Sequence, residues 1–144
     1  HTGKVQWFQP MDRKLGPASE FSVDGLDKLP RVDILYAHAN MSPDLIDAAV
    51  KNGAKGIVIA GVGDGNMTTP ALEAAKKAAK AGVVVVRSTR LPMGLTLRNN
   101  EVNDDELGFV ASGELNPPKS RVLLQLALTK TSDVKRIQAM FYEY

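Results

Sequence analysis

Residues 56–66 read Gly-Ile-Val-Ile-Ala-Gly-Val-Gly-Asp-Gly-Asn, and this stretch decides the fold. Its first five residues form a short apolar run rich in β-branched side chains, which is typical of a buried strand. Three glycines, Asp64 and Asn66 follow, and a helical pattern begins near Pro70. The stretch therefore predicts a strand, a turn with few side-chain atoms, and the start of a helix.

Two further apolar runs, at residues 32–37 and 83–87, lie on either side of this stretch. We expect a helix between each pair of runs, starting with a cap and a proline at Ser42-Pro43 and Thr69-Pro70. Strands that are buried on both faces and separated by helices indicate right-handed βαβ crossovers. The sequence thus predicts a parallel sheet.

The C-terminal part continues this pattern after a long polar excursion over residues 88–108. Phe109–Ala111 is expected to form a fourth, short strand. Two helices should follow, the first capped by Asn116 and the second opened by Ser132-Asp133. The first should bury Val122, Leu123, Leu126 and Ala127, and the second Ile137, Met140 and Phe141. The expected fold class is α/β, with a parallel sheet of about four strands flanked by helices.

The first 30 residues differ from the rest. Lys4–Phe8 alternates enough to be a short strand, and Met11–Pro30 is aperiodic and contains several prolines and glycines. Such a long aperiodic stretch is unusual inside a compact domain. We interpret it as a connecting segment.

Composition narrows the class of partner. The chain has 144 residues, the size of one domain, and a net charge of +2. That charge gives no general reason to expect nucleic acid or an acidic membrane surface as a partner, and no apolar stretch approaches the roughly 18 residues of a membrane span. The lack of cysteine excludes disulfides, thiolate nucleophiles and zinc-thiolate sites. A small molecule or another protein chain is the expected partner.

The glycine turn is the first candidate site, because ligands of open α/β sheets usually lie beyond the carboxyl ends of the strands. It lacks the Gly-Lys-Ser/Thr of phosphate loops, and its third glycine comes one place early for a dinucleotide site. Asn66 can both donate and accept hydrogen bonds, so it could meet an ammonium or a carboxylate. The alternative for Asn66 and Asp64 is a local turn or cap.

Glu101 lies in the polar excursion, at the same edge as Asn66 if the sheet is parallel. A carboxylate beside an asparagine carbonyl would suit a substrate ammonium. The alternative is a solvated loop charge. Asp104, Asp105 and Glu106 could hold a hard cation, although no EF-hand spacing is present.

Other candidates are less specific. His38 could be a base or a metal ligand, but it has no spaced partner histidine and would also fit as a hydrogen-bonded strand-end residue. Arg87 and Arg90 could pair with the acidic loop or bind an anion. No nucleophile-elbow motif occurs, and the chain shows no complete catalytic set.

Several blocks in fixed order resemble bacterial type II L-asparaginases and glutaminase-asparaginases. The likeness runs over essentially the whole chain but covers only the C-terminal part of the family's protein. The blocks are residues 56–66, Val86-Arg-Ser-Thr-Arg90, Glu101-Val102, Gly108-Phe-Val-Ala-Ser-Gly113, Leu115-Asn-Pro117 and 121–129.

The resemblance implies that residues 31–144 are a C-terminal α/β domain, and that residues 1–30 are an interdomain strand and connecting segment. It implies an amidohydrolase that converts L-asparagine, L-glutamine or both to the acid and ammonia without a cofactor. The threonine nucleophile would lie in an N-terminal domain, so no catalytic residue is expected in this chain. The family further implies a periplasmic homotetramer, a dimer of intimate dimers.

By the same resemblance, Asn66 and Glu101 would contact the substrate α-amino group in an active site shared with a neighbouring subunit. The sequence departs from the family pattern at Met67–Thr69 and at Asn99-Asn100, which leaves the choice between the two amides open. Two rival hypotheses are a free-standing α/β module that binds a small ligand and a purely structural oligomerisation domain.

Overall fold

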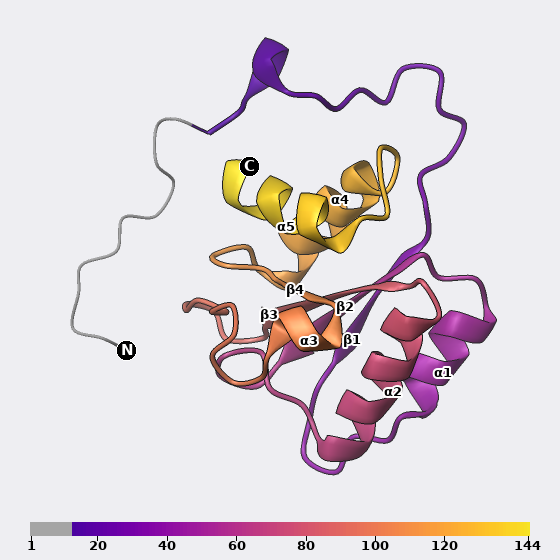
Figure 1. Ribbon diagram of the computed structural model, residues 1–144, viewed down its shortest axis with the longest axis vertical. Helices are drawn as coiled ribbons and strands as arrows, with labels where there is room; N and C mark the ends of the chain where they lie inside the picture. The colour runs from indigo at the N-terminus through magenta and orange to yellow at the C-terminus, as the bar shows by residue number, and fades with distance from the viewer. Residues whose placement is uncertain (1–12) are drawn as a thin grey trace.

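The computed structural model describes residues 13–144, which fold around one parallel sheet (Figure 1). The sheet has four parallel strands, as the sequence predicted, and the structure adds their order, β1-β2-β3-β4. The expected strand at Lys4–Phe8 lies outside the described residues. The strands are β1 (Val32–Tyr36), β2 (Gly56–Gly61), β3 (Val84–Thr89) and β4 (Phe109–Ala111).

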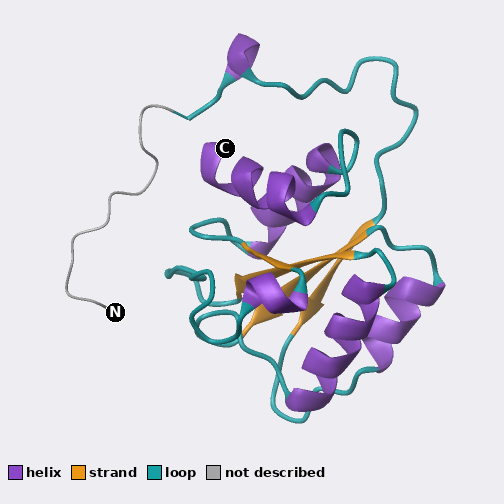
Figure 2. Ribbon diagram, viewed as in Figure 1, coloured by secondary structure: helices purple, strands orange, loops and turns teal. Residues whose placement is uncertain are grey.

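Helices cover both faces of the sheet and give a three-layer α/β arrangement (Figure 2). Helices α1 and α2 pack on one face, and α4 and α5 pack on the other. Ile57 and Ile59 of β2 point into the first core, whereas Val58 points into the second. The helices are α1 (Asp44–Lys51), α2 (Thr69–Lys80), the short α3 (Asp104–Leu107), α4 (Pro117–Ala127) and α5 (Val134–Glu143).

The strands differ in burial. Every residue of β2 and β3 is buried, in agreement with their apolar runs. The first strand was predicted to be buried on both faces, and this was wrong: only Val32 is buried, and Tyr36 is 59% exposed. Both β1 and β4 are outer strands, yet all three residues of β4 are buried, so the edge position alone does not explain the exposure of β1.

The predicted helix starts are displaced by one residue in the first two helices. Helix α1 begins at Asp44, and the hydroxyl of Ser42 accepts the Asp44 N–H at 3.3 Å. Thr68, and not Thr69, caps α2, with its hydroxyl 3.4 Å from the Ala71 N–H. The same hydroxyl donates to the carbonyl of Met41 at 2.8 Å, which ties Thr68 to the preceding βα loop.

The starts of α4 and α5 agree with the prediction, with Asn116 and Asp133 as caps. The predicted buried stripe of α4 was wrong at Val122, which is 52% exposed, and Leu126 is only partly buried, whereas Leu124 is fully buried. Leu124 packs under the start of β2 so closely that a Cβ at Gly56 would lie 2.6 Å from its Cδ2. The apolar face of α4 is therefore turned toward β2.

Residues 13–31 run along the outside of α4 and α5 and contain only the short 3-10 helix η1 (Gly16–Ala18), as Figure 1 shows. The segment is held by polar contacts to the end of α5. Lys14 Nζ lies 2.7 Å from a carboxylate oxygen of Glu143, and the Glu20 N–H donates to the Tyr144 hydroxyl at 2.9 Å. The rings of Phe21 and Tyr144 are 4.7 Å apart.

Candidate functional site

Two loops meet beyond the carboxyl ends of the central strands. The glycine turn follows β2, which ends at Gly61, and the loop that carries Glu101 follows β3, which ends at Thr89. Because β2 and β3 are parallel neighbours, both loops leave the same edge of the sheet. The structure thus places Asn66 and Glu101 at one edge, as the parallel topology predicted.

The glycine turn is a tight reversal of the chain. The backbones of Val62 and Asn66 pair, and each N–H donates to the other residue's carbonyl at 2.8 Å. A Cβ at Gly61 would lie 2.6 Å from the Cα of Gly65, and Gly65 itself has a φ of +80°. These positions need glycine because the backbone doubles back on itself.

Asp64 connects the turn to the Glu101 loop. Its side chain is almost fully buried, and its two carboxylate oxygens accept separate hydrogen bonds from the loop. The Leu97 N–H donates to Oδ1 and the Asn100 amide donates to Oδ2, both at 2.6 Å. Asp64 is therefore neither a helix cap nor a solvent-facing ligand, but a bridge between two segments distant in sequence.

Asn66 remains available for a ligand. It is partly buried, and its backbone is used by the pairing with Val62. Its side-chain amide makes no hydrogen bond to another residue of the described range 13–144. Because Thr68 caps α2, the cap alternative for Asn66 is not supported.

Glu101 is exposed and lines a hollow of about 540 Å³ formed by the loop from Asn99 to Glu106. Within residues 13–144 its carboxylate has no hydrogen-bond or ion-pair partner. The residues on both sides of it are anchored: Asn100 by Asp64, and Asn103 by capping α3 through the Glu106 N–H at 3.2 Å. The loop is held in place while the carboxylate itself stays free to meet a cation.

A buried arginine lies under both loops. Arg87 of β3 forms a two-pronged ion pair with Asp104, with Nε–Oδ1 and Nη2–Oδ2 distances of 2.6 and 2.8 Å. Of the two alternatives for Arg87, pairing with the acidic loop is the one that the structure shows. Arg90 instead donates to the carbonyl of Ala37 at 2.9 Å.

The acidic loop shows no cation site. Asp104 is occupied by Arg87, and residues 13–144 contain no group of three or more His, Cys, Asp or Glu side chains that could hold a metal ion. Asp105 pairs with Arg98 and with Asn99, and the Asn99 amide followed by Arg98 holds the pKa of Asp105 below its ordinary range. The carboxylates of Asp104 and Asp105 are therefore engaged in structural contacts.

His38 lies at the same end of the sheet but is exposed. Its Nδ1 is 2.8 Å from the carbonyl oxygen of the neighbouring Ala39. This is the local contact of a strand-end residue. In the described region no acidic side chain is paired with it, so the structure gives no support for a catalytic base at this position.

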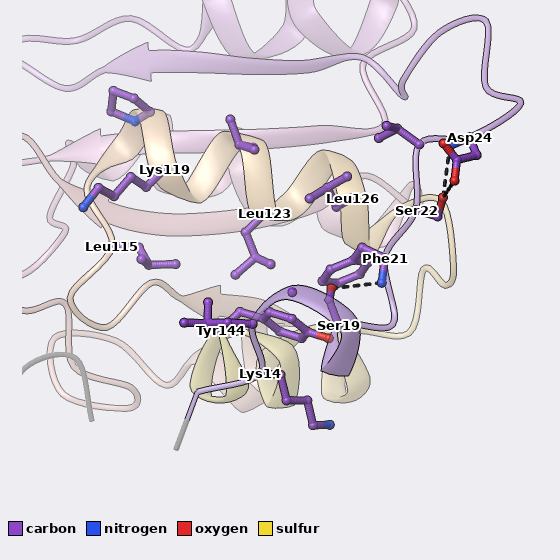
Figure 3. Close-up of a pocket in the computed structure, with 15 residues that line it drawn as sticks. Lys14, Ser19, Phe21, Ser22, Asp24, Leu115, Lys119, Leu123, Leu126 and Tyr144 are labelled. Atoms are coloured by element: carbon purple, nitrogen blue, oxygen red, sulfur yellow. Dashed lines mark hydrogen bonds between the residues drawn. The ribbon is translucent and has the colours of Figure 1, made fainter. Parts of the chain in front are cut away.

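A larger hollow than the one at Glu101 lies elsewhere in the described part of the chain. A groove of about 800 Å³ opens between residues 14–24 and α4 (Figure 3), and neither Asn66 nor Glu101 lines it. Its walls are mostly apolar, and the exposed Val122 is among them. The labelled side chains that point toward it in Figure 3 include Phe21, Leu115, Leu123 and Tyr144.

Residues 31–141 match the family described as the glutaminase/asparaginase C-terminal domain. The chain belongs to this family. It is 49% identical over 144 residues to the probable periplasmic L-asparaginase of Haemophilus influenzae and 47% identical over 144 residues to L-asparaginase 2 of Escherichia coli, with all of this chain covered. It is 43% identical over 145 residues to the glutaminase-asparaginase of Acinetobacter glutaminasificans, with 99% of this chain covered.

Membership in this family confirms both the resemblance and the α/β fold predicted from the sequence. The alignments cover 41% of the Haemophilus and Escherichia proteins and 44% of the Acinetobacter protein. The chain therefore corresponds to the C-terminal part of such enzymes. In the part of the chain that the structure describes, each helix is too short or too polar to cross a bilayer.

The sequence did not reveal how the two loops are joined. A signal existed for Asp104, because the apolar run of the third strand ends in Arg87 and a buried guanidinium needs a carboxylate. No comparable signal existed for Asn100, whose exposed side chain lies 36 residues from its partner Asp64.

Proposed function

We propose that this chain is the C-terminal part of an amidohydrolase that hydrolyses L-asparagine, L-glutamine or both to the acid and ammonia. The observation that carries the proposal is the family match over residues 31–141, together with 47% identity to L-asparaginase 2 of Escherichia coli across the whole chain. The name of the Acinetobacter relative includes both amides, so both remain in the proposal.

In this proposal Asn66 and Glu101 bind the α-ammonium group of the substrate. The unengaged amide oxygen of Asn66 and the free carboxylate of Glu101 are acceptors that suit a cation. Their loops are joined by the Asp64–Asn100 hydrogen bond, which supports a common binding edge. Holding the ammonium aligns the scissile amide, and the loss of such a charged contact costs about 2 to 4 kcal/mol of transition-state binding.

In this proposal, the groups that react with the substrate lie outside residues 1–144. A threonine in an N-terminal domain of the same protein attacks the side-chain amide, ammonia leaves, and water hydrolyses the acyl-enzyme. Residues 1–144 supply orientation to the active site of a neighbouring subunit in a dimer of intimate dimers. No cofactor is needed, and the location is the periplasm, as the name of the Haemophilus relative suggests.

Ammonia release by the full-length protein tests the assigned residues. Glu101→Gln and Asn66→Ala should each lower kcat/KM for L-asparagine by about 30-fold to 1000-fold, the equivalent of 2 to 4 kcal/mol. Glu73→Gln, which changes an exposed carboxylate on α2, should leave the kinetics unchanged. Unchanged kinetics in the Glu101 and Asn66 variants would remove both residues from the site.

The isolated chain provides a second test. Purified residues 1–144 should release no ammonia from L-asparagine, and ammonia release without any other polypeptide would refute the assignment of the nucleophile to another domain. Calorimetric titration of the same material with L-aspartate should show no tight binding. Tight binding would instead favour a free-standing ligand-binding module.

A further inference from the structure

The glycine turn and the Glu101 loop are held to each other by two buried side chains. We propose that Asp64 and Arg87 are positioning residues, which fix Asn66 and Glu101 at the separation that the substrate α-amino group requires. This inference rests on the proposed function, and it assigns a role to two residues that do not themselves contact substrate.

Arg87 donates hydrogen bonds to both loops. It is 1% exposed, and its guanidinium reaches three separate segments. Nη1 donates to the carbonyl of Asp64 in the turn at 2.7 Å, Nη2 donates to the carbonyl of Leu97 in the loop at 3.0 Å, and Nε and Nη2 hold Asp104 at the start of α3. Because the guanidinium is rigid and planar, it fixes these three segments relative to one another.

Asp64 joins the same two loops through its carboxylate. It lies two residues before Asn66, and its partner Asn100 lies one residue before Glu101. Its other oxygen holds the Leu97 N–H at 2.6 Å. One carboxylate therefore sets the distance between the backbones that carry the two proposed substrate contacts.

Asp104 fixes the loop on the C-terminal side of Glu101. Besides its ion pair with Arg87, its Oδ2 accepts the Asn99 N–H at 2.8 Å. The loop is thus fixed at Leu97, Asn99 and Asn100 before Glu101, and at Asp104 after it. Burial of this carboxylate, at 0% exposure, is tolerated because its charge is paired with Arg87 and both of its oxygens accept hydrogen bonds.

Gly65 shows how closely the turn rests on Arg87. A Cβ at this position would lie 3.0 Å from Arg87 Nη1 and 2.9 Å from Thr96 Cγ2. The turn therefore sits directly on the guanidinium without a side chain between them. A shift of Arg87 would be transmitted to the turn and to Asn66 beyond it.

The test compares two substrates in the full-length protein. L-asparagine carries the α-ammonium, whereas succinamate has the same side-chain amide without the α-amino group. Asp64→Ala should lower kcat/KM for L-asparagine about tenfold, because a small displacement of a positioning contact has an effect of this order. It should change succinamate hydrolysis less than about twofold. Equal losses for both substrates would mean a general structural defect and would overturn the proposal.

A conservative variant and a control sharpen this test. Asp64→Asn should restore most of the lost activity, because its amide oxygen can still accept the Leu97 N–H and the Asn100 amide can turn to accept a hydrogen bond from the new amide nitrogen. Asn52→Ala removes another exposed asparagine side-chain hydrogen bond, at the opposite end of β2, and should change neither substrate's kinetics. Failure of Asp64→Asn to recover activity would contradict the role assigned to these hydrogen bonds.

Hydrogen exchange gives a readout that does not depend on activity. In the full-length protein, peptides that span residues 94–103 should exchange about tenfold faster in Asp64→Ala, while peptides of β2 stay unchanged. Arg87→Lys keeps the charge but loses the fork, and it should produce the same change. Unchanged exchange would overturn the proposal. A wild type that hydrolyses neither amide would refute the proposed function, and the exchange result would then decide by itself whether Asp64 fixes the loop.

Discussion

Ion pairs hold two regions of this protein in different ways. The rim formed by the two loops depends on Arg87 and Asp104, which are 1% and 0% exposed. Residues 13–31 are held by two ion pairs to α5, Lys14–Glu143 and Arg136–Glu20, whose side chains are 29% to 45% exposed. A third pair, Arg13–Glu114, is more buried, at 15% and 16% exposed. Buried groups with all partners present fix a geometry, whereas solvated pairs are screened and contribute little. The rim is therefore fixed by buried charges, whereas the ion pairs that join residues 14–20 to α5 are open to solvent.

The largest expected effect comes from breaking the buried pair. Arg87→Met should lower the free energy of unfolding by about 3 to 5 kcal/mol, because it leaves Asp104 buried without a counter-charge. Denaturant unfolding of the variant and of the wild type measures the difference. Arg31→Met removes an exposed ion pair with Asp33 and should have little effect. Equal losses in the two variants would end the distinction between the buried and exposed pairs.

Replacing both partners should recover part of this loss. In Arg87→Met/Asp104→Leu no charge remains unpaired, and apolar side chains fill the space. We expect the double variant to be more stable than Arg87→Met alone, while its loop should be less well fixed. A double variant as unstable as the sum of the single variants would show that the two residues act independently.

The next effect concerns Gly65, for which the chain offers a matched control. Gly65→Ala combines a positive φ of +80° with the contacts to Arg87 and Thr96, and should cost about 3 kcal/mol. Gly82→Ala has a similar φ of +87° but no atom within 4 Å of the new Cβ, and should cost about 1 kcal/mol. Thermal unfolding of both variants separates crowding from backbone strain. Equal costs would show that the turn does not press on the arginine.

A smaller effect is expected from acid on the connecting segment. Lys14 and then Arg136 lower the pKa of Glu143, while Glu143 raises the pKa of Lys14. The contribution of Glu143 is therefore present above the ordinary glutamate value of about 4.3 and is lost as pH falls through its lowered pKa. That of Lys14 is present below about 10.4 and is lost as pH rises through its raised pKa.

Amide NMR signals of residues 13–21 should report this loosening between pH 7 and 3. Glu143→Gln should show the loosened spectrum already at pH 7, because the carboxylate is gone. The Leu97 amide should not follow the same transition, since Asp64 holds it in the rim. A segment whose signals stay constant over this range would show that its other contacts, such as Arg13–Glu114 and Phe21–Tyr144, hold it without the Glu143 carboxylate.

The smallest effect should be that of salt. Raising the ionic strength from about 0.01 to 1 M shortens the screening length from about 30 to 3 Å. Exchange of amides in residues 13–21 should rise by a few-fold, and exchange in residues 94–103 should not change. A rim that responds as strongly as the segment would indicate that solvent reaches Arg87.

The sequence was sufficient for the sheet and for the edge that carries the candidate residues. The apolar runs of β2 and β3 are long enough to identify buried strands, and parallel topology then brings Asn66 and Glu101 to one edge. The finer features depend on contacts between distant segments. A helical pattern gives an apolar face to within about one residue, which is why Val122 was misplaced. The Asp64–Asn100 hydrogen bond joins residues 36 positions apart, and no periodicity in the sequence indicates it.

The outer edge of β1 has a consequence for how the molecule behaves in a crowded solution. A strand with one unpaired side is a template onto which another polypeptide can add and extend the sheet. Here the Arg121 Nε donates to the carbonyl of Val32 at 2.8 Å, and the Arg31–Asp33 ion pair projects beside it. The Arg121 side chain thus occupies the Val32 carbonyl, a backbone acceptor that an added strand would need. The charged side chains of Arg31 and Asp33 lie on the same strand end. Both features disfavour the addition of another strand to the free edge of β1.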